Sequence, residues 1–125
     1  MVVDSDILID FFRDYPQAKE FLLTTEDNLK VSRVTVMEIV VGVKTKIAAR
    51  KALKQLDALG IKIVEVTETV SQLAGDILTE NRHKFGTGIL DSFVAATALQ
   101  AGEKLSTRNV KHFKQIKDLG LTVPY

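Results

Sequence analysis

The sequence predicts an α/β domain in which a parallel sheet carries helices on both faces. Short apolar runs alternate along the chain with segments whose apolar residues recur at helical spacing, an order typical of parallel sheets. The 125 residues include two prolines and no linker-like segment, so nothing in the sequence divides the chain. We therefore expect one domain over residues 1–125.

The expected strands are the short apolar runs, which cover residues 1–3, 29–32, 61–66, 104–106 and 121–123. The stretches between them have helix signals. Pro16 suits the first position of a helix, Gly60 suits the position after one, and residues 91–101 are apolar enough for a buried helix. The other expected helices cover residues 35–43, 46–59, 68–83 and 110–116.

Composition excludes several classes of protein. The chain has no cysteine, which rules out a disulfide scaffold and a thiolate zinc site. No apolar run is long enough to cross a membrane, and Asp4 interrupts the first apolar residues before a signal peptide can form. We therefore expect a soluble cytoplasmic protein.

Charge is unevenly distributed, although the net charge is +1. Acidic residues predominate in residues 1–27, and two later regions are purely basic. Lys46 and Arg50 belong to one of these regions, and Lys104 and Arg108 belong to the other. An acidic focus beside basic surfaces suits a polyanion held by residues such as Lys46, Arg50 and Arg108. The same runs also fit solvated helix faces.

Four carboxylates near strand ends are the main candidates for chemistry. Asp4 and Asp6 follow the first strand, and Glu38 and Asp91 lie near the starts of later helices. Such positions face one crevice at the carboxyl ends of the strands. Two carboxylates roughly 5 Å apart repel by about 3 kcal/mol at an effective dielectric of about 20. A divalent metal ion is the simplest way to hold them together.

Each carboxylate also fits a structural role. Asp4 suits the cap of the following helix, and Thr35 together with Glu38 matches a capping box. Asp6 and Asp91 are placed to stabilise helix N-termini through charge alone. The residues by themselves leave both interpretations open.

The segment after the fourth strand offers further polar groups. Thr107 and Asn109 present a hydroxyl and an amide to a phosphate or a metal-bound water, and both also fit caps of the next helix. The two histidines, His83 and His112, have no partner spacing typical of a zinc site. No Gly-rich phosphate-binding loop is present.

Four blocks of the sequence resemble PIN-domain nucleases, above all the VapC-type toxins of toxin–antitoxin pairs. The first block begins Val3-Asp4-Ser5-Asp6, and the second carries Glu38 within residues 34–42. The third begins Leu90-Asp91-Ser92, and the fourth covers residues 105–113. The blocks occur in the family's order and together span essentially the whole chain.

The resemblance implies a three-layer α/β/α PIN-like domain with a parallel sheet of about five strands. It implies cleavage of RNA with Mg²⁺ or Mn²⁺, a homodimer, and a small cognate antitoxin that inserts a segment near the acidic site. Asp4, Glu38 and Asp91 match the family's metal-site acids. The fourth acid is missing, because its places hold Asn109 and His112, and this departure should weaken a second metal site.

Our leading hypothesis is therefore a metal-dependent endoribonuclease. Asp4 and Asp91 would bind the ion directly, Glu38 directly or through water, and Asp6 would support it. Asn109 would orient a water, and Thr107 and Arg108 would contact RNA along with the basic residues.

Three alternatives remain. Asp4 and Asp6 also fit the nucleophile and acid of a haloacid-dehalogenase-like phosphatase. A signalling receiver would need an acceptor Asp after the third strand, and residues 64–67 supply none. A PIN-fold binding module would keep the fold and lose the catalysis. The apolar pairs Phe11–Phe12 and Phe21–Leu23 are candidates either for partner contacts or for ordinary core packing.

Overall fold

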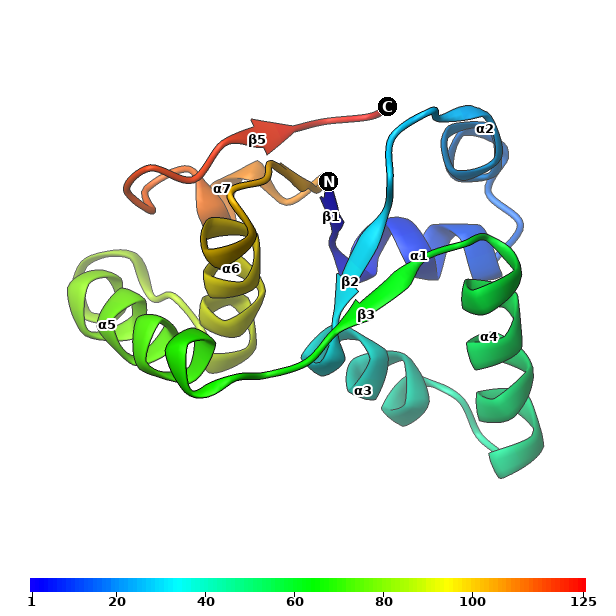
Figure 1. Ribbon diagram of the computed structural model, residues 1–125, viewed down its shortest axis with the longest axis horizontal. Coiled ribbons are helices and arrows are strands. Elements are labelled where there is room, and N and C mark those ends of the chain that lie inside the picture. The colour runs from blue at the N-terminus through cyan, green and yellow to red at the C-terminus, as the bar shows by residue number, and fades with distance from the viewer.

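A computed structural model describes residues 1–125 and confirms the α/β architecture (Figure 1). One sheet of five parallel strands has the order β3-β2-β1-β4-β5. The strands are short: β1 (Val2–Val3), β2 (Lys30–Ser32), β3 (Lys62–Val64), β4 (Leu105–Ser106) and β5 (Leu121–Thr122). Because β1 is the central strand, the residue that follows it lies in the middle of the sheet's carboxyl edge.

Seven helices connect and cover these strands: α1 (Ser5–Phe12), α2 (Pro16–Thr24), α3 (Arg33–Gly42), α4 (Lys46–Ala58), α5 (Glu68–Phe85), α6 (Ile89–Ala101) and α7 (Val110–Phe113). Pro16 is the first residue of α2, as predicted. Gly86 and Gly102 end α5 and α6 in the left-handed conformation, which glycine adopts without a steric penalty.

Two separate cores lie on the two faces of the sheet. Val2 belongs to one cluster with residues of α5, α6 and α7, and its neighbour Val3 belongs to another with residues of α1 to α4. Successive side chains of a strand point to opposite faces, so one dipeptide anchors both cores. Figure 1 shows the resulting layers, with α5, α6 and α7 on one side and α1 to α4 on the other.

Two helix starts differ from the sequence-based expectation. Helix α3 begins at Arg33, and its cap is Ser32, whose Oγ accepts a hydrogen bond from the Val34 amide at 3.2 Å. Thr35 is fully buried inside the helix, so the predicted capping box with Glu38 is wrong. Strand β2 ends at Ser32 and the helix begins at the next residue, so the cap falls on Ser32 and not on Thr35. Helix α6 begins at Ile89, so the predicted range 91–101 starts two residues late.

The apolar side chains of Phe11–Phe12 and Phe21–Leu23 pack mainly inward. Phe11, Phe12 and Phe21 lie against the core between the sheet and α1 to α4, and Leu22 is buried within it. Leu23 is the exception, with 66% of its surface exposed. Core packing is thus their main observed role. Separately, no helix combines the length and the apolar character that a membrane crossing requires.

Leu8 and Leu23 provide a matched test of this packing. Leu8 is fully buried in α1, so Leu8→Ala should lower the free energy of unfolding by about 2–5 kcal/mol. Leu23→Ala, on the exposed side of α2, should change it by no more than about 0.5 kcal/mol. Urea denaturation followed by circular dichroism measures both. Equal effects would contradict the described packing of α1.

Candidate active site

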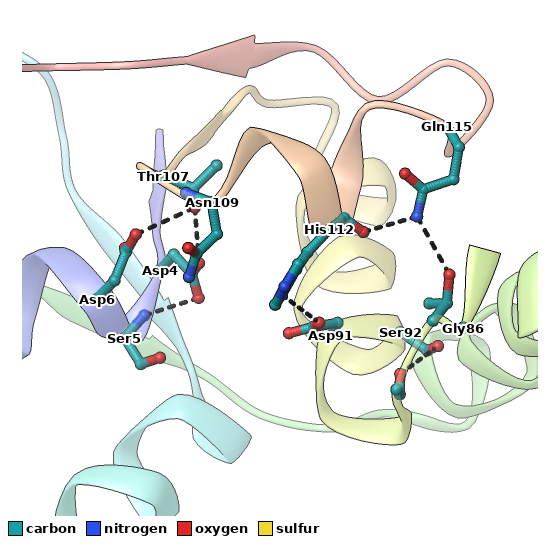
Figure 2. A network of polar contacts seen from close by, with 12 residues as sticks. Asp4, Ser5, Asp6, Gly86, Asp91, Ser92, Thr107, Asn109, His112 and Gln115 are labelled. Carbon is teal, nitrogen blue, oxygen red and sulfur yellow. Dashed lines mark hydrogen bonds and ion pairs between the residues drawn. The ribbon is translucent and has the colours of Figure 1, made fainter.

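Asp4 occupies the centre of the candidate site, between the end of β1 and the start of α1. Its amide donates to the carbonyl of Ser106 at 2.9 Å, which ties it to β4. Its Oδ1 accepts from the Ser5 amide at 2.8 Å, and its Oδ2 accepts from the Thr107 hydroxyl at 2.7 Å (Figure 2). Asp4 therefore caps α1 and is 4% exposed. Capping fixes the carboxylate in place and leaves each oxygen a lone pair.

The loop after β4 is bound to the start of α1 by a second acid. Asp6 Oδ2 accepts from the Arg108 amide at 2.8 Å. Thr107 connects Asp4 to the same loop. Its hydroxyl donates to Asp4 and also accepts from the Asn109 amide at 3.0 Å. Thr107 is completely buried and has a positioning role in this structure. The expected cap by the Asn109 side chain is absent.

The side chain of Arg108 bonds Asp10 and not Asp6. Its Nη1 donates to Asp10 at 2.8 Å, and its guanidinium lies 4.9 Å from the ring centre of Tyr125 and 5.6 Å from that of Tyr15. The Tyr125 hydroxyl donates to the same carboxylate at 2.9 Å. The charge of Arg108 is therefore already paired, which weakens it as a free phosphate ligand.

Asp91 lies across the site from Asp4, in the first turn of α6 (Figure 2). Its Oδ2 is 3.3 Å from Nδ1 of His112. Gln115 holds that histidine in place, since its Nε2 donates to the His112 carbonyl at 2.8 Å and to the Thr87 hydroxyl at 3.2 Å. The sequence identified His112 only as the occupant of a missing acid's place, so its contact with Asp91 was not foreseen.

Glu38 reaches the site from the middle of α3 and lines a pocket of about 580 Å³ together with Asp91. The other residues around this pocket come from α5 and from the turn that leads into α6: Leu78, Arg82, Thr87, Gly88, Ile89 and Leu90. Arg82 was not among the sequence-derived candidates, because its segment has no chemical motif.

Burial raises the pKa of all four carboxylates, and the charges of neighbouring acids add to the effect. Burial, followed by the charge of Asp6, raises the pKa of Asp4 from its ordinary 3.8 to about 6. Burial and the charge of Asp91 raise the pKa of Glu38. Burial also raises the pKa of Asp6 and Asp91, and His112 partly offsets the effect at Asp91. The crevice therefore disfavours its own negative charge.

The donor set fits a hard divalent cation. Carboxylate oxygens are the ligands that Mg²⁺ prefers, and Asp4 has no cationic partner to balance its burial. No three acidic or histidine side chains are placed to hold one ion simultaneously. This arrangement suits an ion that is held by one or two carboxylates and keeps several waters, which is the usual binding mode of Mg²⁺.

The comparisons with known proteins agree with this geometry. The PIN domain family matches residues 1–119. The chain belongs to the PIN-domain family, among its VapC-type ribonucleases. Ribonuclease VapC10 of Mycobacterium tuberculosis is 31% identical over 122 residues, which cover 95% of this chain and 90% of that protein. The family resemblance carried by the four sequence blocks is thereby confirmed.

Solved structures of similar fold come from toxin–antitoxin systems. A toxin–antitoxin complex from Klebsiella pneumoniae superposes with a TM-score of 0.77 at 26% identity and covers 99% of this chain and 97% of that one. VapBC-1 from nontypeable Haemophilus influenzae gives a TM-score of 0.78 at 23% identity, with coverage of 98% and 96%. The second likeness supports the PIN fold alone.

Two of the remaining sequence-derived candidates lie apart from the carboxylates. Lys46 and Arg50 are on α4, which packs against α3, whereas Asp91 is on α6 at the other side of α3 (Figure 1). Asn109 is exposed at the start of α7 and lies next to the site, because its amide donates to the Thr107 hydroxyl that bonds Asp4. Contact of Lys46 and Arg50 with RNA and the role of Asn109 stay predictions.

The pKa of Asp4 predicts how pH changes stability. Near pH 4–6 the folded PIN domain keeps a proton on Asp4 that the unfolded chain has lost, so stability of the metal-free protein should fall as pH rises through this range. Asp4→Asn removes the buried charge and keeps a good helix cap, so it should stabilise the metal-free protein by about 1–3 kcal/mol at roughly pH 7.5.

Urea denaturation in EDTA at several pH values measures this effect. The exposed Asp76 on α5 provides the control, since Asp76→Asn should leave the pH profile of unfolding unchanged. A destabilised Asp4→Asn variant with the wild-type pH profile would show that Asp4 is not the group under electrostatic strain.

Proposed function

We propose that this VapC-type ribonuclease is an endoribonuclease that hydrolyses RNA phosphodiester bonds with Mg²⁺ or Mn²⁺. The observation that carries the proposal is the buried, cation-free carboxylate of Asp4, which faces a crevice shared with Asp6, Glu38 and Asp91. Burying an unbalanced charge is unfavourable. A cation bound among these acids would balance the charge.

Asp4 and Asp91 are the proposed direct ligands of the ion. Asp4 is immobilised by Ser5 and Thr107, and Asp91 by the first turn of α6 and by His112. A divalent cation held there lowers the pKa of a bound water and stabilises negative charge on the phosphate. Because both carboxylates are already oriented, little reorganisation is needed when RNA binds.

Glu38 and Asn109 have the proposed task of handling water. Glu38 has a raised pKa, so its carboxylate accepts a proton more readily than an ordinary glutamate and suits the orientation of an attacking water. Asn109 is neutral and exposed at the crevice edge, where its amide can hold a second water. Asp6 supports the site through the backbone of Arg108.

The missing fourth acid favours a single ion over a pair. Asn109 contributes no charge, and His112 is directed at Asp91, so neither replaces a carboxylate ligand. A two-ion site needs more negative charge to offset the repulsion of the cations. We therefore propose one bound ion.

We also propose a cytoplasmic toxin that forms a homodimer and is inhibited by a small antitoxin. The support is the family and the description of the Klebsiella pneumoniae relative as a toxin–antitoxin complex. Membership of the PIN family favours the nuclease over the phosphatase alternative with Asp4 as nucleophile. A binding module without catalysis remains a separable outcome of the test that follows.

Asp91→Asn should reduce Mg²⁺-dependent cleavage of single-stranded RNA by roughly 100-fold or more, because it removes one proposed ligand and its charge. The asparagine is similar in size and still accepts a hydrogen bond, so the thermal unfolding midpoint should not fall. Gel analysis of labelled RNA gives the rate, and calorimetry with Mn²⁺ gives the affinity.

Asp76→Asn again provides the control and should retain wild-type cleavage. EDTA should stop the wild-type reaction, and added Mg²⁺ should restore it. Full activity of Asp91→Asn would refute the proposed site. Wild-type protein that binds RNA but never cleaves it would instead support the binding module.

A further inference from the structure

We propose that the pocket between α3, α5 and the start of α6 is a nucleotide subsite, in which Arg82 binds a phosphate of single-stranded RNA while apolar neighbours contact the adjoining base. The inference rests on the proposed ribonuclease function. It places the part of the RNA next to the cleaved bond on the α6 side of the carboxylates. The pocket measures about 580 Å³, within the range typical of small-ligand sites.

Arg82 is fixed in an orientation that suits an anion. It lies in the last turn of α5, and its Nη1 donates to the carbonyls of Gly86 at 3.0 Å and Thr87 at 3.3 Å. Thr87 is itself anchored by Gln115, so the guanidinium is tied to a braced turn. Nη2 and Nε retain three N–H groups in a planar fork, which matches two oxygens of a phosphate.

The charge of Arg82 is unpaired, although Glu38 and Asp91 line the same pocket. Arg33 is paired with Glu65 and Arg108 with Asp10, whereas Arg82 forms no ion pair with any carboxylate. An RNA phosphate that approaches the acidic crevice meets repulsion, and a fixed cation beside the crevice offsets it. Arg82 is the arginine that lines the pocket shared by Glu38 and Asp91.

The rest of the lining suits an unstacked base. Ile89 and Leu90 are exposed by 63% and 48%, and Leu78 lies beside them in the same pocket. Apolar side chains next to a phosphate ligand can cover the face of a base that has left its stack, as enzymes acting on single-stranded nucleic acid require. A base held in a duplex stays stacked and paired and cannot fill such a pocket, so we expect the subsite to favour single-stranded RNA.

Binding as a function of salt tests the phosphate contact. The probe is a short fluorescein-labelled single-stranded RNA of mixed sequence, titrated by anisotropy in EDTA so that no cleavage occurs. Arg82→Gln should weaken binding about tenfold or more and reduce the slope of log K against log[salt] by about 0.7, the loss of one phosphate contact. Arg82→Lys should keep the slope and lose part of the affinity, because lysine retains charge without the fork.

Ile89→Ala tests the base contact, and it should weaken binding several-fold at an unchanged salt slope because no charge is lost. Arg33→Gln and Ile47→Ala are the matched controls. Arg33 is paired with Glu65, and Ile47 is an 80% exposed apolar residue on α4. Both controls should bind RNA as the wild type does. In Mg²⁺, Arg82→Gln should raise KM more than it lowers kcat.

The outcomes separate this subsite from the proposed function. An unchanged salt slope and affinity in Arg82→Gln, with normal wild-type cleavage, would overturn the subsite and leave the pocket to a protein partner. An equal loss in Arg33→Gln would also overturn it, because the effect would then be general electrostatics. A wild type that does not cleave RNA would refute the proposed function, whereas the salt slopes would still report on Arg82.

Discussion

The hydrogen bond from the Thr107 hydroxyl to the Asp4 carboxylate joins segments 103 positions apart in the chain. It ties the loop after β4 to the start of α1 and helps to fix the buried carboxylate of Asp4. Loss of this bond would leave Asp4 buried with one partner fewer. The cap of α1, the loop after β4 and the acidic site therefore form one cooperative unit.

That unit carries electrostatic strain. Burial raises the pKa of Asp4, Asp6, Glu38 and Asp91, and the protein offers them hydroxyl, amide and imidazole contacts in place of a full cationic partner. Burying several carboxylates costs stability relative to a neutral core of the same shape. In the proposed function a bound cation would offset this cost, so the site would exchange stability for activity.

The surroundings of the site divide into a rigid part and an open part. On the β1 side, Asp6, Asp10 and Arg108 form a closed network with Tyr125 and leave few free donors. On the α6 side, the braced turn after α5 presents Arg82 and exposed apolar side chains to the pocket. In the proposed function, the two flanks of the carboxylates would therefore contribute differently to substrate binding.

The sequence by itself determined the α/β class, the five strands and the positions of Asp4 and Asp91 near helix starts, whereas Glu38 lies in the middle of α3. These features follow from local periodicity and from the rule that carboxyl ends of parallel strands meet at one edge. Only the tertiary structure decided that Ser32 rather than Thr35 caps α3, that His112 faces Asp91, and that Arg82 enters the pocket of Glu38. The contact of His112 with Asp91 and the pocket shared by Arg82 and Glu38 join segments far apart in the chain, and a local pattern of residues does not encode which distant side chains meet. The cap of α3 is local, but it falls on Ser32 because β2 leads directly into the helix.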